Sequence, residues 1–541
     1  MKFFFFLSCL TISAVIVFAN SATLIGPWDQ NSWMINAYLS LKGETFLVES
    51  WPLPEGFIEQ YITSTDQGSS SAIRHTPFAN SSFFFTFSPE LSFNNWSYYP
   101  SSTWVDLIQV YRYDSMKDFV DFGYKTSIGN DIYALIDMDI RKEMGNFFAK
   151  DDTTNFPFTY LNVLSPAIDA NFPNQGYISY FNGNILLQAG REKLAWSPMT
   201  NGLALSDASP YYDQGSFMYT TPANFIKRFT FSYNAISIDP ELTPYEYEEQ
   251  STSPDPIADN TVYNEPSKFL FAHRLDFQIF KNLRIGLGEL KLLGGKYPNF
   301  RDFNPFIIWH NTYGEGYSND MGDFDFNYVP IDGINLYGEF ALDQLTTSFI
   351  AGQPINYKPR AYAYAYGLTK NWGDWNDLSQ VGAEYYYVTP WMYNRWQPYL
   401  EFTNRIMRVS ENPGSRWFTD YPIGYLYGPD VETLRLFYNN HDQFLDTNIN
   451  LNWIRKGQIT TLTPYNPNDY AATTPTGTPE DIKDINITFN YNLTKSISLF
   501  FSGDLRYVTN YQNQDTPNTP IILGNVWLYD FSFGFQYSYN D

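Results

Sequence analysis

The sequence predicts an all-β protein, a transmembrane antiparallel β-barrel of about 16 to 18 strands. Aromatic residues make up 19% of the chain although its mean hydropathy is −0.34, so apolar and polar residues must be interleaved. Two further observations predict a barrel: long segments of alternating polarity, and connections that alternate between short turns and long polar loops. The strands of a transmembrane barrel turn apolar side chains toward lipid and polar side chains toward the lumen. Composition alone leaves a secreted β-sandwich or propeller open.

The C-terminal segment carries the clearest strand pattern. Aromatic residues occupy alternate positions there: Trp527, Tyr529, Phe531, Phe533, Phe535, Tyr537 and Tyr539. A period of two places all these rings on one face of a strand, and the residues between them are mostly small or polar. An aromatic face of this length fits lipid and its interfaces better than the core of a sandwich.

The preceding segments pair into hairpins with unequal connections. Residues 485–493 and 497–507 alternate around a short turn at 494–496, and long polar loops at 463–481 and 509–520 flank this pair. Long outer loops and short periplasmic turns are typical of outer-membrane barrels. Further alternating segments lie at 225–233, 361–366 and 381–387, and two more hairpins pair 269–279 with 283–287 around a turn at 281–282, and 323–328 with 334–342 around a turn at 330–333. No repeat of fixed period is present, which disfavours a propeller.

The N-terminus is typical of an export signal. Lys2 precedes an apolar stretch, and Val17-Phe18-Ala19 provides a cleavage motif, so we expect residues 1–19 to be a signal peptide. Residues 20–541 would then form a single outer-membrane barrel domain. Cys9, the one cysteine, lies within the signal, so the mature chain would have neither a disulfide nor a cysteine zinc site.

Charge and motifs argue against several classes of function. A formal net charge of −24 disfavours nucleic-acid binding, which needs a basic footprint. The four histidines are scattered, and neither a two-histidine zinc motif nor a Gly-x-Ser-x-Gly elbow occurs. We therefore expect no enzyme activity, no metal site and no cofactor.

Two segments differ from the background of strands and polar loops. The first, residues 190–207, begins Gly-Arg-Glu-Lys-Leu-Ala-Trp and is followed by two tyrosines. The second, residues 422–430, reads Pro-Ile-Gly-Tyr-Leu-Tyr-Gly-Pro-Asp. Both resemble segments of the outer-membrane capsule-assembly family called Wzi. Shorter similarities extend the resemblance over roughly residues 50–430: Ser50 to Pro54, His273 to Leu275, Ile285 to Glu289, Asn304-Pro305, Leu336 to Glu339 and Asp343.

The resemblance implies a barrel of about 18 strands in the outer membrane that acts as a lectin. It would retain or organise capsular or exopolysaccharide at the cell surface, without catalysis. The residues that we predict to bind polysaccharide are Arg191, Trp196, Asp207, Tyr211 and Tyr212. Aromatic rings offer apolar faces to sugar C–H groups, and an arginine can clamp the carboxylate of an acidic sugar. Packing of Trp196 and Tyr211 inside the barrel, or a position in an aromatic girdle, is the structural alternative.

The sequence departs from the family pattern in two places. Ser197 and Met199 replace the glycines of a Trp-Gly-Pro-Gly turn. The family also has a small periplasmic helical bundle, and no clear amphipathic helix is visible in this sequence. A porin or selective channel for sugars or small solutes is the second functional hypothesis, and a barrel without a ligand is the third. We expect surface polysaccharide and outer-membrane lipid as partners, and a monomer.

Overall fold

The computed structural model describes most of the chain between residues 22 and 540. The residues that it does not describe within this span are 30–31, 66–80, 95–110, 112–113, 116, 130, 143–167, 170–173, 222–227, 253–260, 310–316, 345–358, 410–415, 467–468, 470–471 and 512–523. The predicted signal peptide lies outside the described residues, so it stays a prediction.

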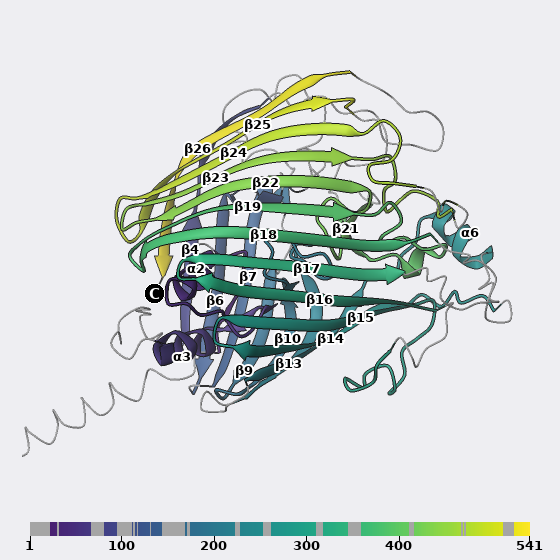
Figure 1. Ribbon diagram of the computed structural model, residues 1–541, viewed down its shortest axis with the longest axis horizontal. Coiled ribbons are helices and arrows are strands. Elements are labelled where there is room, and N and C mark those ends of the chain that lie inside the picture. The colour runs from purple at the N-terminus through teal and green to yellow at the C-terminus, as the bar shows by residue number, and fades with distance from the viewer. Residues whose placement is uncertain are drawn as a thin grey trace, which may run out of the picture.

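Within the described part of the chain, eighteen antiparallel strands close into one barrel (Figure 1). The first half of the ring consists of β4 (Ser81–Phe87) with β5 (Glu90–Asn94), β6 (Val120–Ile128), β7 (Ile132–Lys142), β9 (Gln175–Phe181), β10 (Ile185–Glu192), β12 (Tyr212–Thr220), β13 (Phe229–Ile238), β14 (Lys268–Phe280) and β15 (Leu283–Gly294). The second half consists of β16 (Ser318–Ile331), β17 (Ile334–Gln344), β18 (Ala361–Asp374), β19 (Asp377–Val388), β22 (Val431–His441), β23 (Leu445–Lys456), β24 (Glu480–Asn492), β25 (Ile497–Thr509) and β26 (Val526–Asn540).

The last strand closes the ring onto the first. β26 pairs with both β4 and β5, which share one place in the wall, and Tyr537 lies opposite Phe87. The two-residue strand β8 (Ile168–Asp169) pairs antiparallel with the end of β7. Closure satisfies the backbone hydrogen bonds of the wall from strand to strand, which is the condition for a β-structure to cross a membrane.

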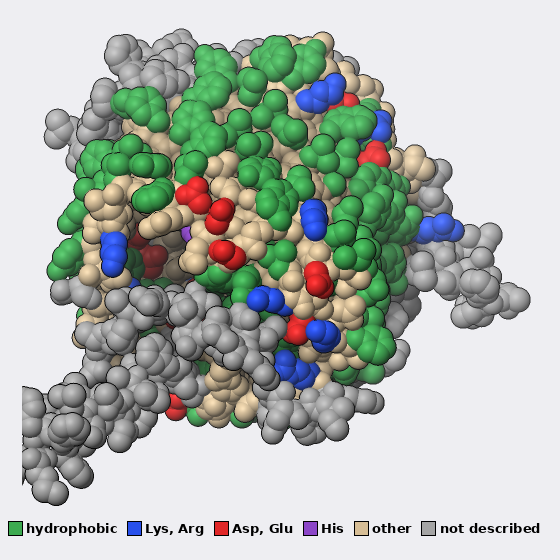
Figure 2. All heavy atoms as spheres, turned by 60° about the vertical axis from the view of Figure 1, so that its left-hand side comes forward, with side chains coloured by type: hydrophobic (Ala, Val, Ile, Leu, Met, Phe, Trp, Pro, Cys, Tyr) green, Lys and Arg blue, Asp and Glu red, His purple; other side chains and the backbone are tan. Residues whose placement is uncertain are grey.

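Side-chain alternation along β26 confirms the predicted lipid face. Trp527 and Phe533 are 57% and 47% exposed, whereas Leu528 between them is 4% exposed. Exposed aromatic and aliphatic side chains recur on the outer wall, and Figure 2 shows hydrophobic groups covering much of the surface seen there. A sealed ring with an apolar exterior requires lipid around it. The protein is an outer-membrane β-barrel.

The two ends of the barrel differ as the sequence predicts. Tight turns join the strands at one end, among them 281–282, 332–333, 375–376 and 493–496, and the C-terminus lies at this end (Figure 1). The long connections, including α6 (Pro244–Thr252), lie at the other end. Following the pattern of outer-membrane barrels, we assign the short-turn end to the periplasm and the long-loop end to the outside.

The N-terminal segment folds into the short-turn end of the barrel. It contains β1 (Leu24–Ile25), α2 (Trp33–Leu41), β2 (Ser50–Trp51), β3 (Leu53–Pro54) and α3 (Glu55–Thr65). The sequence shows no clear amphipathic helix here, yet the segment forms two helices. Most side chains of α2 are buried, so this helix lacks the polar face from which an amphipathic period is recognised. Among the described residues, no helix is both long and apolar enough to cross a membrane.

The barrel interior holds two hydrophobic clusters. One is formed by the N-terminal segment against inward side chains such as Tyr133 and Leu186. The other is formed by two segments that enter from the long-loop end, residues 194–209 and the described residues of 389–409 and 416–430, against inward side chains such as Ile236 and Ala363. The first of these segments, which we name the inner loop, contains β11 (Ala195–Trp196). The second contains η1 (Pro398–Leu400), β20 (Thr403–Val409) and β21 (Arg416–Pro422).

Candidate functional site

The inner loop, residues 194–209, is anchored by a carboxylate of the barrel wall. Glu339 lies on β17 and is 3% exposed. Its Oε1 accepts hydrogen bonds from the backbone N–H groups of Leu203 (2.8 Å) and Ala204 (3.0 Å), and its Oε2 accepts one from the Ser197 hydroxyl. Buried backbone donors of a loop need such acceptors, since water cannot reach them. Glu339 thereby fixes both sides of the turn.

A second wall carboxylate holds the tip of the same loop. Glu384 on β19 accepts hydrogen bonds from the backbone N–H of Thr200 (3.1 Å) and from its hydroxyl (2.9 Å). The hydroxyls of Tyr337 and Tyr386 also donate to Glu384, at 2.9 and 2.8 Å. Arg435 completes this cluster with an ion pair to Glu384 at 2.8 Å. The tip is therefore bound to three strands of the wall.

The two segments highlighted by the sequence contact each other inside the barrel. The backbone N–H of Ser206 donates to Ile423 O at 2.8 Å, and the Tyr393 hydroxyl donates to Leu203 O at 2.6 Å. A Cβ on Gly424 would lie 2.2 Å from Leu203 O, so only glycine permits this approach. The sequence singled out both segments, more than 200 residues apart, but not their contact.

Trp196 lies in the middle of the barrel, where the inner loop meets the N-terminal segment. The residue is 0% exposed, and it pairs with Ser50 in a two-stranded sheet of β11 and β2. The adjacent backbone N–H of Ser197 donates to Glu49 O at 3.1 Å. The guanidinium of Arg274 lies 5.8 Å from the ring centre of Trp196. Trp196 is thus a packing residue of the barrel interior, the alternative that the sequence left open.

A buried ionic network lies beside Trp196 on the inner wall. Arg274 pairs with Asp276, Asp323 and Asp325, and Arg284 pairs with Asp276 (2.7 Å) and Asp325. All five side chains are fully buried. Each charge faces an opposite charge at hydrogen-bond distance, with two arginines shared among three aspartates. Removing one arginine would therefore leave buried carboxylates without their partner.

The structure divides the five predicted site residues among three surroundings. Arg191 and Tyr211 lie together, with the guanidinium of Arg191 3.9 Å from the ring centre of Tyr211 and hydrogen-bonded through two nitrogens to Asp213 (2.9 and 2.8 Å). Tyr212, like Trp196, is buried, and its hydroxyl donates to Ser206 O at 3.1 Å. Asp207 is partly buried in the inner loop, and this burial raises its pKa.

Arg191 lies on the outer face near the long-loop end of β10. It shares the outward register with the exposed Leu187 and lies opposite Asp213, which is 51% exposed. The burial of Trp196 and Tyr212 excludes direct contact with a surface polymer in this conformation. Of the predicted residues, Arg191 and Tyr211 form the one pair that the structure both brings together and leaves accessible.

The long-loop rim carries exposed tyrosines that sequence reasoning missed. Tyr245 and Tyr247 on α6 are 60% and 58% exposed, and Tyr297 is 56% exposed. Arg405 of β20 fixes α6 in place through ion pairs with Glu246 (2.7 Å) and Asp420 (2.6 Å). The sequence around α6 is acidic, and its Tyr-Glu-Tyr spacing was the available signal. Similarly, Glu339 lay within a segment of family resemblance, but no role was assigned to it.

Comparisons with known proteins support the architecture. No protein-family model and no curated protein sequence matches this chain. Among solved structures, the chain is similar to Wzi of Escherichia coli, an outer-membrane protein involved in group 1 capsule assembly and described as a carbohydrate-binding β-barrel. The alignment covers 95% of this chain and 99% of that one, with a TM-score of 0.54 and 14% sequence identity. The predicted Wzi-like barrel fold is thereby confirmed.

Other outer-membrane barrels match more loosely. OccK3 of Pseudomonas aeruginosa aligns with 85% of this chain and 96% of its own, at 9% identity and a TM-score of 0.40. OccAB2 of Acinetobacter baumannii aligns with 85% of this chain and 98% of its own, at 11% identity and a TM-score of 0.40. No functional argument rests on these two.

Proposed function

We propose that this barrel binds capsular or exopolysaccharide at its long-loop end and helps to assemble or retain it at the cell surface, without catalysis. The proposal rests on the contact between the inner loop and the N-terminal segment, which are hydrogen-bonded to each other at Trp196 and Ser197 in the middle of the barrel. A barrel whose interior is packed in this way serves as a scaffold for its outer surface rather than as a wide passage. The carbohydrate binding described for Wzi supports the same reading.

The rim tyrosines provide the chemistry for such binding. Tyr245, Tyr247 and Tyr297 present more than half of their surface, and tyrosine faces pack against the C–H faces of sugars while the hydroxyl reaches sugar oxygens. The Arg191–Tyr211 pair is the second contact patch that we propose. An acidic sugar there would compete with Asp213 for the guanidinium of Arg191, so binding at this patch would weaken as salt is added.

The proposal is tested with purified protein and isolated cell-surface glycan. We expect the double change Tyr245→Ala and Tyr247→Ala to weaken glycan binding severalfold, because two stacking faces are removed from an exposed helix. Tyr539→Ala, an exposed ring at the opposite end of the barrel, is the matched control and should leave binding unchanged. In a deletion strain, surface polysaccharide should be lost to the medium and restored by the wild-type gene but not by the double variant.

A channel for sugars or small solutes is the second candidate. Figure 2 shows a hollow at the short-turn end with acidic side chains inside it, a feature that a solute path would use. Large, stable single-channel currents from the purified protein, together with unchanged polysaccharide retention in the deletion strain, would favour the channel and contradict the first proposal.

A further inference from the structure

Residues 299–309, which we name the wall loop, fold back against the outer face of the barrel. In Figure 1 the chain leaves the right-hand end of β15 and turns below the strands. The Tyr233 hydroxyl donates a hydrogen bond to Phe303 O at 3.1 Å, and the ring of Phe306 stacks on Phe231 at 5.4 Å. Tyr233 and Phe231 point outward, because the alternate residues of β13 are buried on its inner side. The wall loop therefore covers part of the membrane-facing wall.

The side of the wall loop that faces the barrel is polar. His273 donates from Nδ1 to Pro305 O at 2.9 Å and lies 3.2 Å from Glu289 through Nε2. Glu289 also accepts a hydrogen bond from the backbone N–H of Trp309 at 2.9 Å. Lys291 and Asp302 form an ion pair at 3.0 Å, with exposures of 0% and 2%. Charged side chains on the lipid side of a barrel are costly, and the wall loop removes these from contact with lipid.

The opposite side of the wall loop exposes large apolar side chains, beside the exposed Asn299, Arg301 and Asn304. Phe300, Phe306 and Ile308 are 97%, 78% and 63% exposed. Exposed apolar groups gathered in this way mark a site of interaction. Because the wall beside them faces the membrane, lipid is the medium that these side chains fit. The wall loop thus directs its polar contacts to the barrel and exposes apolar side chains on the membrane-facing side.

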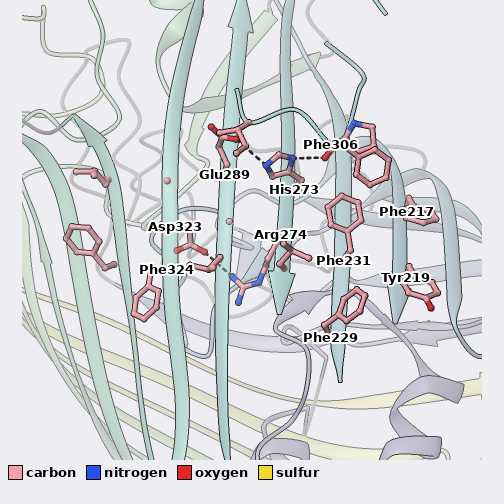
Figure 3. A pocket seen from close by; sticks show the side chains of 18 residues that line it. Phe217, Tyr219, Phe229, Phe231, His273, Arg274, Glu289, Phe306, Asp323 and Phe324 are labelled. Carbon is pink, nitrogen blue, oxygen red and sulfur yellow. Dashed lines mark hydrogen bonds and ion pairs between the residues drawn. The ribbon is translucent and has the colours of Figure 1, made fainter. Parts of the chain in front are cut away.

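A groove of about 850 Å³ opens between the wall loop and the strands (Figure 3). Its volume falls within the roughly 300–1,000 Å³ of ligand sites. Apart from His273 and Glu289 at its upper end, the outward side chains that line it are apolar, among them Phe217, Phe229, Phe231, Leu275, Leu287 and Phe324. Gly322 leaves the floor open, since no atom lies within 4 Å of the place where its Cβ would stand.

We propose that this groove binds a hydrocarbon chain of a membrane lipid, held beneath the wall loop. The groove runs from Phe306 and His273 at its upper end down to Tyr219 and Phe229, along the direction that an acyl chain takes in the leaflet (Figure 3). The polar groups at its upper end are already hydrogen-bonded to the wall loop, so the space below them favours an apolar occupant. This inference is independent of polysaccharide binding.

Photolabelling in proteoliposomes tests the proposal. The probe is a phosphatidylethanolamine that carries a diazirine in the middle of one acyl chain, and mass spectrometry locates its adducts. We expect the strands of the groove, β12 to β17, to be labelled several-fold more than the opposite wall, β22 to β25. Gly322→Leu should reduce groove labelling several-fold, because its side chain would fill the open floor.

Gly215→Leu is the matched control. Gly215 is also exposed on the outer wall, has no atom within 4 Å of its Cβ position, and lines a neighbouring hollow of about 490 Å³. This variant should leave groove labelling unchanged, and both variants should keep the heat-dependent gel mobility of a folded barrel. Equal labelling around the ring, or equal groove labelling in Gly322→Leu and wild type, would overturn the proposal. Cross-links between copies of the chain at the groove would assign it to a protein partner instead.

Discussion

At the scale of single residues, paired charges in this barrel differ in what surrounds them. Arg274 and its three aspartates are 0% exposed, whereas Arg191 and Asp213 are 25% and 51% exposed. Coulomb attraction is screened at the second pair, and water replaces either partner that is removed. At the first, no water replaces a lost guanidinium, and the aspartates would keep their charge in a medium of low polarity. The two ion pairs therefore contribute very differently to the free energy of unfolding.

The comparison of Arg274→Ala with Arg191→Ala tests this difference. We expect Arg274→Ala to lower the free energy of unfolding by about 3–5 kcal/mol, the cost of breaking a buried pair. Arg191→Ala should lower it by about 0–1 kcal/mol, as for exposed pairs. Urea unfolding of the barrel in lipid vesicles measures both. A loss in Arg274→Ala no larger than that in Arg191→Ala would contradict the role given to the buried network.

At the scale of elements, register decides what a substitution costs. Phe533 on β26 faces lipid and is 47% exposed, whereas the adjacent Ser532 faces the interior. We expect Phe533→Arg to destabilise the barrel by about 2–4 kcal/mol if it lies near the bilayer midplane, and Ser532→Arg to cost clearly less. Folding into vesicles at increasing urea concentration shows which of the two variants is less stable. A larger loss for Ser532→Arg would reverse the assigned lipid face.

The two-residue alternation of side chains along a strand explains which elements could be predicted from the sequence. The alternation at 485–493, 497–507 and 527–539 is a property of neighbouring residues, so the strands and their lipid face were readable without a structure. The helix α2 was not, because the surrounding barrel buries it on most sides. The site was only partly readable. The segment around Trp196 carried a recognisable pattern, but its anchors, Glu339 and Glu384, are 142 and 184 residues from their partners in the inner loop.

At the scale of the whole molecule, the barrel is held from inside as well as around its circumference. Glu339 and Glu384 tie the inner loop to the wall, β11 and β2 tie it to the N-terminal segment, and Ser206 ties it to the segment around Ile423. Elements that enter from opposite ends thus meet in one packed interior. An interior of this kind keeps the strands in one arrangement and supports a fixed long-loop surface, which a polysaccharide-binding scaffold needs.

Shortening the inner loop tests whether this loop closes the lumen of the barrel. We expect replacement of residues 197–205 by a short Gly-Ser linker to raise the conductance of the barrel in planar bilayers, because the contacts of Ser197, Leu203 and Ala204 in the lumen are removed. Equivalent replacement of residues 244–252, which form α6 at the rim, is the control and should leave conductance at the wild-type level while weakening glycan binding. If the shortened variant folds, as judged by gel mobility, and conducts no more than wild type, the inner loop is not what closes the lumen. A wild-type protein that already conducts as strongly as the shortened variant would contradict the packed-interior argument directly.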